Sequence, residues 1–269
     1  MKTARTAVVY FSQTGNTERV AQAIGRGLSR AGTAVETFDL LATDPRTMLA
    51  YELVGIGAPV FYYREPVVVE RFIKAMPGMP GRHAFIFLTS GGNPANTFHH
   101  MARALRRRGL VVIDSYACHG YDTYPPFIGQ DRFAGHPDRD EIAAAQEFGT
   151  RLPVRLERVR DGDLTQLPRF ARQWDRMGRL SIIFRSGLMS KLLLPRKVVN
   201  REKCIRCGIC VDRCPVKIIR LDPFPVFARG CIHCYLCERV CPVDAIECDW
   251  RFIKRKMQSY EKKQAEGRK

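Results

Sequence analysis

Eight of the chain's ten cysteines lie between positions 204 and 241, and their spacing is that of a metal-binding motif. The pattern C-x2-C-x2-C-x3-C-P occurs twice, with cysteines at Cys204, Cys207, Cys210 and Cys214, then at Cys231, Cys234, Cys237 and Cys241. Three thiolates at this spacing allow a short loop to wrap three corners of an iron–sulfur cube, and the fourth cysteine of each copy ligates the cluster of the other copy. The sequence therefore predicts two 4Fe–4S clusters, held by Cys204, Cys207, Cys210 and Cys241 and by Cys231, Cys234, Cys237 and Cys214.

The two copies are an internal duplication with an offset of 27 residues. Residues other than the cysteines also correspond: Ile205 with Ile232, Val216 with Val243, Ile219 with Ile246 and Asp222 with Asp249. Zinc ligation and structural disulfides are the two alternatives. Zinc sites usually pair two separate C-x2-C knuckles, and disulfides require an oxidising compartment, for which no secretory signal is present. Residues 200–249 resemble a bacterial two-cluster ferredoxin, which implies a small α+β fold.

The length of 269 residues suits two domains rather than one. We expect a domain at 1–150, a connector at 151–199, a cluster domain at 200–249 and a tail at 250–269. The cluster domain is too small to bury much apolar surface, so its clusters must stabilise it. The longest apolar runs are shorter than a bilayer-spanning helix. Because the N-terminus also leads directly into a strand pattern, we expect a cytoplasmic protein.

The net charge of +17 is unevenly distributed along the chain. Residues 1–150 carry +2 and residues 204–249 are neutral, whereas residues 151–203 carry +9 and residues 250–269 carry +6. This asymmetry predicts docking to an acidic redox partner. Residues 180–195 are apolar with basic residues between, which favours an amphipathic helix packed on the first domain but also allows a peripheral membrane contact. No nucleic-acid-binding motif accompanies the basic charge, so we expect no nucleic acid partner.

The first 150 residues alternate between strand and helix patterns, which predicts a doubly wound α/β sheet. The expected order along the sheet is 2-1-3-4-5, with a ligand crevice where strands 1 and 3 diverge. The expected strands are 6–12, 35–40, 51–60, 83–90 and 110–119. The stretch from Ser12 opens a first helix that runs to about Arg30, and the other expected helices are 65–75, 95–108 and 138–151.

The loop after the first strand has the composition of a phosphate cradle. It combines hydroxyl side chains with a glycine directly before a helix, and its residues are Ser12, Gln13, Thr14, Gly15, Asn16 and Thr17. The free backbone N–H groups and the positive end of the helix dipole favour an anion. The loop lacks the lysine of a P-loop and the G-x-G-x-x-G pattern, so a monophosphate fits better than a triphosphate. An ordinary helix cap remains the alternative.

Three loops together resemble those of flavodoxins. The phosphate loop is one, and the second and third follow the third and fourth strands, at Pro59, Val60, Phe61, Tyr62 and Tyr63 and at Thr89, Ser90, Gly91, Gly92 and Asn93. The resemblance covers residues 4–150 and implies FMN, with Phe61, Tyr62 and Tyr63 as a stacking wall and Gly91 and Gly92 allowing close backbone approach. The flavodoxin pattern is incomplete in one respect: no tryptophan precedes residue 174, and Phe98, Tyr121 and Tyr124 are equal candidates for the flavin's second face.

Several other polar residues fit ordinary structural roles. We expect His99 and His100 to face solvent and Cys118 to be a buried strand residue. The sequence also predicts that the glycines of Gly25-Arg-Gly27 and Gly55-Ile-Gly57 serve packing rather than dinucleotide binding.

The whole chain resembles iron–sulfur flavoproteins in which a flavodoxin domain precedes a two-cluster ferredoxin. This implies an electron-transfer protein that relays electrons between FMN, two 4Fe–4S clusters and a redox partner. Two alternatives remain open: a flavin-dependent reductase of a small substrate fed by the clusters, and a flavin-free scaffold that docks a ferredoxin onto a complex. No catalytic acid or base stands out, so enzymatic activity stays undecided at this level.

Overall fold

The computed structural model describes residues 4–127, 132–175, 178–179 and 192–266. The chain forms two compact units. Unit 1 comprises Met1–Asp122 and Arg132–Phe184, and unit 2 comprises Thr123–Asp131 and Arg185–Lys269.

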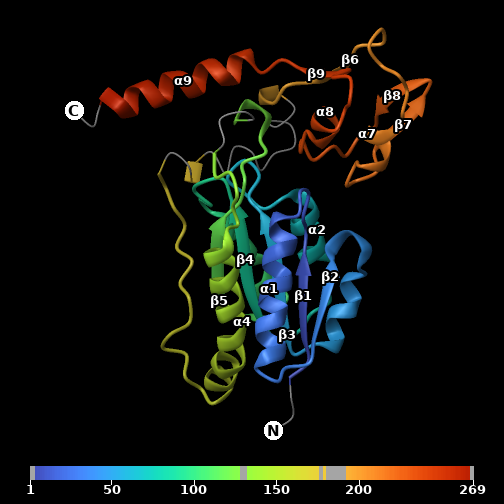
Figure 1. Cartoon of the computed structure of the whole chain (residues 1–269). Helices are drawn as coiled ribbons and strands as arrows, with labels where there is room; N and C mark the ends of the chain where they lie inside the picture. The colour runs from blue at the N-terminus through green and yellow to red at the C-terminus, as the bar shows by residue number, and fades with distance from the viewer. Residues whose placement is uncertain (1–3, 128–131, 176–177, 180–191, 267–269) are drawn as a thin grey trace. The chain divides into compact units, whose positions relative to one another are not determined.

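Unit 1 contains a five-stranded parallel sheet (Figure 1). The strands are β1 (Thr6–Tyr10), β2 (Val35–Asp39), β3 (Leu53–Pro59), β4 (His83–Ser90) and β5 (Val111–His119). Their order is β2-β1-β3-β4-β5, which confirms the predicted flavodoxin-like topology. β1, β3 and β4 are apolar and almost entirely buried because neighbours cover both faces of these central strands.

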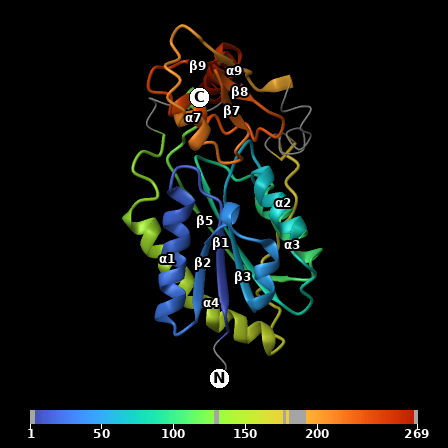
Figure 2. The same ribbon diagram turned by 90° about the vertical axis from the view of Figure 1, so that its right-hand side faces the viewer.

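Helices cover both faces of this sheet (Figure 2). One face carries α1 (Asn16–Arg30) and α4 (Arg139–Arg160), and the other carries α2 (Val67–Ala75) and α3 (Thr97–Arg106). Short 3-10 turns at Leu40–Ala42 and Pro45–Ala50 connect β2 to β3, and another lies at Pro125–Phe127. A hydrophobic core cluster joins α1 and α4 to the sheet, and includes Ile24, Phe85, Phe87, Phe148 and Leu152.

Helix α4 is longer than the sequence predicted. The prediction that it ends near Arg151 is wrong, because it continues through Pro153 to Arg160. A proline inside a helix removes one backbone hydrogen bond. Here Leu152, Leu156 and Val159 stay buried at helical spacing, and their packing holds the helix together past the proline.

Close packing explains three of the predicted packing glycines. A Cβ on Gly27 of α1 would lie 2.0 Å from the Gln146 carbonyl oxygen of α4. In the sheet, a Cβ on Gly55 or Gly57 would lie 2.1 Å from the ring of Phe85 or Phe87, respectively. The packing role predicted for these glycines is therefore confirmed.

We expect Gly149→Ala to destabilise unit 1 by roughly 2–3 kcal/mol, the upper range for overpacking a filled interior. Gly149 lies in α4, and its Cβ would be 2.2 Å from the Ile24 carbonyl oxygen, so α1 and α4 would have to separate. Chemical denaturation of the two proteins measures the difference. The control is Gly78→Ala, because a Cβ there meets nothing within 4 Å. Equal stability of the two variants would contradict the packing argument.

Unit 2 is built from short elements around cysteine-rich loops. Two antiparallel pairs join β6 (Lys197–Val199) to β9 (Ile246–Cys248) and β7 (Ile219–Asp222) to β8 (Phe224–Phe227). The helices are α7 (Ile209–Asp212), α8 (Leu236–Arg239) and α9 (Arg251–Glu266). Its small core consists of Cys210, Cys214, Cys237, Ile219 and Ile246.

The backbone of unit 2 repeats with the same offset of 27 residues as the sequence. Left-handed residues occur in three matched pairs, Arg206 with His233, Gly208 with Tyr235, and Lys217 with Asp244. Five of these six residues are not glycine and seldom adopt a positive φ, so the matching positions show that the two halves share one loop conformation.

No described helix combines the length and the hydropathy that crossing a bilayer requires. The amphipathic helix predicted for residues 180–195 lies mostly outside the described residues. The basic tail after Trp250 is helical, as α9, through Glu266.

Candidate cofactor sites

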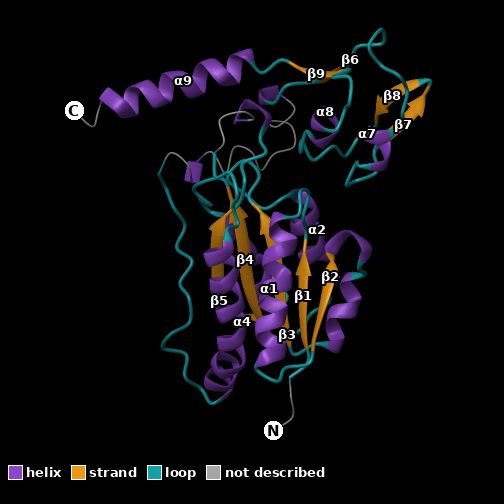
Figure 3. Cartoon of the chain, viewed as in Figure 1, coloured by secondary structure: helices purple, strands orange, loops and turns teal. Residues whose placement is uncertain are grey.

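The predicted phosphate loop connects β1 to α1 (Figure 3). Gly15 is left-handed, with φ of 91°, and its N–H donates to the Ser12 hydroxyl at 3.1 Å. The turn brings the chain into α1, whose first N–H groups have no partner within the helix. A Cβ on Gly15 would meet nothing within 4 Å, so there is open space beside the loop. A phosphate therefore fits this loop.

The side chains of the loop have different tasks. The Thr17 hydroxyl is buried and shares a 2.8 Å hydrogen bond with the Thr89 hydroxyl, so it joins the first turn of α1 to the end of β4. The Asn16 side-chain amide donates to the Tyr121 carbonyl oxygen at 3.4 Å. Thr14 is exposed. Ser12, Thr14 and Thr17 were predicted to bind an anion, and among these three Thr14 is the exposed residue.

The loop after β3 has an unusual backbone. Phe61 and Arg64 exchange backbone hydrogen bonds of 2.7 and 3.0 Å, which closes a tight turn. The two central residues, Tyr62 and Tyr63, have φ of 51° and 65°, conformations that are uncommon for bulky side chains. Phe61 also packs edge-on against Phe11, with ring centroids 6.2 Å apart. The turn thus holds aromatic residues in a constrained position at the end of β3, where an aromatic wall was expected.

The loop after β4 is joined to the end of β5. The Gly120 N–H donates to the Ser90 carbonyl oxygen at 3.1 Å, and the Ser90 hydroxyl donates to the Gly92 carbonyl oxygen at 2.6 Å. A Cβ on Gly91 would lie 2.5 Å from the Asp122 carboxylate, so Gly91 makes room for that side chain. The space at Gly92, by contrast, is open. A close approach of a ligand was expected at both glycines. At Gly91 the group that lies close to the backbone is instead the Asp122 side chain of the protein itself.

Two candidates for the second aromatic face have partners of their own. Phe98 stacks on Phe170, with centroids 5.6 Å apart and an interplanar angle of 18°. Tyr124 belongs to unit 2, where it packs edge-on against Trp250. Tyr121 is half-buried at the end of the β5 loop.

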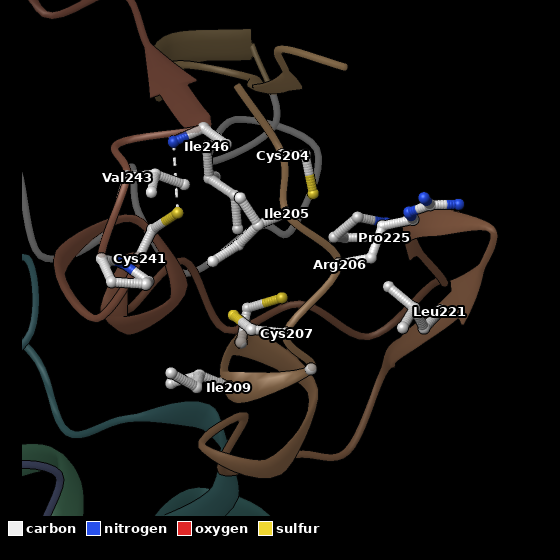
Figure 4. Close-up of a pocket in the computed structure, with 14 residues that line it drawn as sticks. Cys204, Ile205, Arg206, Cys207, Ile209, Leu221, Pro225, Cys241, Val243 and Ile246 are labelled. Carbon is white, nitrogen blue, oxygen red and sulfur yellow. Dashed lines mark hydrogen bonds between the residues drawn. The ribbon is translucent and has the colours of Figure 1, made fainter. Parts of the chain in front are cut away.

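The first set of cysteines surrounds one pocket in unit 2 (Figure 4). Cys204, Cys207 and Cys210 come from the first motif, and Cys241 comes from the second. Apolar residues complete the wall, among them Ile205, Leu221, Val243 and Ile246. The Cys241 sulfur accepts the N–H of Ala245 at 3.1 Å. The fourth cysteine of the second motif thus lies beside the first three cysteines of the first motif.

The second set of cysteines is also brought together across the two motifs. Burial and, to a smaller extent, the nearby Cys231 and Cys214 raise the pKa of the Cys234 thiol, and burial with the nearby Cys234 and Cys231 does the same for the pKa of Cys237. The Cys231 sulfur accepts the N–H of His233 at 3.4 Å. N–H···S bonds of this kind are among the features that tune iron–sulfur sites.

Burial makes these thiols poor acids. It raises the pKa of Cys234 to about 11 and the pKa of Cys237 to about 12. A buried thiolate therefore needs positive charge beside it, which iron supplies on ligation as the protons leave. Two groups of four cysteines without competing ligands suit 4Fe–4S clusters.

Sequence reasoning missed a buried ion pair beside the flavin loop. The Arg64 guanidinium lies 2.8 Å from Glu65 and 3.6 Å from Glu70. His100 is half-buried, with Nδ1 3.7 Å from the Glu65 carboxylate, and His99 Nδ1 lies 2.8 Å from the Phe170 carbonyl oxygen. The expectation that both histidines face solvent is wrong, because α3 turns them toward the protein. The Arg64-Glu65 dipeptide could have indicated this ion pair in the sequence, because charged residues so close to a buried strand require partners.

Residues 8–112 match the flavodoxin family, and residues 197–220 and 225–247 match the 4Fe-4S binding domain. A flavodoxin from Clostridium saccharobutylicum is 39% identical over 57 residues, which are 21% of this chain. The match spans about a third, 36%, of that relative's length.

Three solved structures are similar to part of this chain. An archaeal flavodoxin is 18% identical, with a TM-score of 0.45, and covers 57% of this chain and 99% of its own. A flavodoxin of Streptococcus pneumoniae TIGR4 is 14% identical, with the same TM-score, and covers 56% and 99%. The flavodiiron core of Flv1 from Synechocystis sp. PCC6803 is 18% identical, also at 0.45, and covers 59% and 37%.

The two matched parts are electron-transfer domains, which gives the chain a redox role. The flavodoxin domain implies FMN, and the two 4Fe-4S motifs imply two clusters. The chain is therefore a fusion of an N-terminal flavodoxin domain with a C-terminal domain that carries two 4Fe-4S binding motifs.

Proposed function

We propose that this protein relays electrons between FMN, two 4Fe–4S clusters and a redox partner. The observation that carries the proposal is the presence in one chain of a flavodoxin-like sheet and of two cysteine quartets that cross between the motifs. FMN exchanges one or two electrons and each cluster exchanges one, so the flavin supplies a junction between two-electron and one-electron chemistry.

Residues Ser12–Thr17 hold the FMN phosphate in this proposal, through the N–H groups at the start of α1 and the exposed Thr14 hydroxyl. The ring lies between the loop after β3 and the loop after β4, which supply Pro59, Val60, Phe61 and Tyr62 and Ser90, Gly91 and Gly92. The constrained turn at Tyr62 and Tyr63 supports this placement, because backbone strain gathers at binding sites.

Cys204, Cys207, Cys210 and Cys241 hold one cluster, and Cys231, Cys234, Cys237 and Cys214 hold the other. Apolar residues line the first pocket, and the N–H groups of Ala245 and His233 donate to ligand sulfurs. Burial and N–H···S bonds are the means by which a protein sets cluster potentials.

The test is anaerobic purification followed by a count of cofactors and a rapid-reduction experiment. We expect one FMN and about eight irons per chain, the content of two 4Fe–4S clusters. After partial reduction, the flavin and the clusters should exchange electrons at a rate independent of protein concentration, because transfer is within the chain. A rate proportional to concentration would contradict the relay, and eight irons without flavin, even after FMN is added, would favour the scaffold.

The partner is acidic in this proposal, and the exposed basic residues of α9 are its contact. Lys254, Arg255 and Lys256 are exposed. Much of the basic charge of residues 151–160, by contrast, is used within unit 1: Arg160 pairs with Glu52 and Glu157, and Arg155 donates to the Ile113 carbonyl oxygen. We therefore assign to the basic residues of the tail part of the docking role that was predicted for the connector.

We expect the association rate with an acidic electron carrier to fall roughly tenfold between about 10 mM and 300 mM salt, as electrostatic steering is screened. Neutralising Lys254, Arg255 and Lys256 to Gln should lower the low-salt rate and flatten this dependence. Stopped-flow reduction of the carrier measures both. Arg151→Gln is the control, because Arg151 is already paired with Glu147. A rate that does not vary with salt would contradict an acidic partner.

A further inference from the structure

Two histidines and a glutamate meet where β5 ends and α4 begins. His119 is the last residue of β5, His136 lies in the following loop, and Glu141 is in the first turn of α4. One ligand atom from each residue lies within 4.8 Å of the other two. The cluster belongs wholly to unit 1, and neither the flavin loops nor the cysteine motifs include it.

Backbone groups orient the carboxylate at the centre of this cluster. Oε1 of Glu141 accepts the N–H of His119 at 2.9 Å, and Oε2 accepts the N–H of Asp138 at 3.0 Å. A carboxylate offers about four acceptor positions, so each oxygen keeps one more lone pair. The ring nitrogens face these positions: Nδ1 of His136 is 2.7 Å from Oε2, and Nδ1 of His119 is 3.4 Å from Oε1.

We propose that His119, His136 and Glu141 form a binding site for a divalent transition-metal ion of the zinc type. Two imidazoles and one carboxylate are a ligand set that zinc accepts, with water in the remaining position. Ligand atoms at about 2.0–2.2 Å from a tetrahedral ion lie roughly 3.3–3.6 Å from one another. The His119–Glu141 distance of 3.4 Å falls in this range, and the 2.7 Å hydrogen bond between His136 and Glu141 would lengthen as the ion takes the place of its proton. The N–H bonds to Glu141 provide the outer contacts that orient a metal-bound carboxylate.

The surroundings of the site suit a cation and give it a way in. The His119 side chain is 48% exposed, so an ion can reach the site from solvent. Its ring stacks on Phe133, with centroids 4.2 Å apart and an interplanar angle of 9°, which holds the imidazole in place. The start of a helix disfavours a cation, but Asp138, Asp140 and Glu141 place three carboxylates there.

The experiment is equilibrium dialysis of the cofactor-loaded protein against micromolar ZnCl2, with zinc and iron counted per chain by elemental mass spectrometry. The wild type should take up one zinc with its iron unchanged. His136→Gln and Glu141→Gln should each weaken this uptake at least ~100-fold, since each removes a direct ligand. Glutamine at position 141 keeps the capping-box hydrogen bond to Asp138, so the helix start is preserved.

His99→Gln is the matched control, because His99 lies in the same unit but is bonded to the Phe170 carbonyl oxygen. It should bind zinc as the wild type does. Zinc should also raise the melting temperature of the wild type and of His99→Gln, but not that of His136→Gln. Equal zinc uptake by the wild type and His136→Gln overturns the proposal, as does zinc gained only with loss of iron, which would mean binding to cysteines. Absence of uptake would show that Glu141 is only a hydrogen-bond acceptor.

Discussion

The double variant Cys204→Ala/Cys241→Ala should lose one cluster, whereas Cys204→Ala/Cys214→Ala should lose both. In the crossed arrangement, Cys204 and Cys241 serve the same cluster, so their combined loss leaves about four irons per chain. Cys204 and Cys214 serve different clusters, so their combined loss leaves about none. Iron analysis and the visible spectrum of the anaerobically purified variants measure the result. This comparison separates pairing across the motifs from pairing within each motif, which a single replacement cannot do.

Pairing within each motif would give the opposite order, with four irons left in Cys204→Ala/Cys214→Ala and none in the other variant. Cys248→Ala and Cys118→Ala are the controls, and both should keep about eight irons. Burial and the neighbouring Glu238 raise the pKa of the Cys248 thiol, and burial raises the pKa of Cys118 to about 12, so neither is a ready thiolate. Loss of iron from either control would mean that the ligand set is wrong.

The cluster motifs could be predicted from the sequence because their information is local. Three cysteines within seven residues leave the loop few ways to fold, and the second copy repeats them with the same left-handed positions. The strands of the first unit were predictable for a related reason, since β1, β3 and β4 are continuous apolar runs between turn residues.

Other features depend on which distant segments meet, and no local pattern contains that information. Gly91 was predicted to give room to a ligand, but the side chain it accommodates is Asp122. Helix α4 passes Pro153 because α1 packs along it, which the helix's own sequence does not show. The His119–His136–Glu141 cluster likewise forms only because separate segments of the chain meet. Its one local sign was the capping box of Asp138 and Glu141, which marks a helix start and does not indicate the histidines.

Thr14→Glu should weaken FMN binding by at least ~100-fold, which corresponds to about 2.7 kcal/mol. The proposed phosphate site lies at the start of α1, and a carboxylate on the exposed Thr14 would stand beside a dianion. Repulsion of this size is reasonable for charges several Å apart at an effective dielectric constant of about 20. Titration of the flavin-free protein with FMN, followed by flavin fluorescence, measures the dissociation constant.

Two comparisons separate charge from other effects of this substitution. Thr14→Gln has nearly the same shape without the charge and should lose little affinity, because the backbone N–H groups of α1 remain. Riboflavin, which lacks the phosphate, should bind Thr14→Glu about as well as it binds the wild type. Because Thr14 is exposed, the fold should tolerate either side chain. If Thr14→Glu weakened riboflavin and FMN equally, the loop would contact the ring rather than the phosphate, and the assignment of Ser12–Thr17 as the phosphate cradle would be wrong.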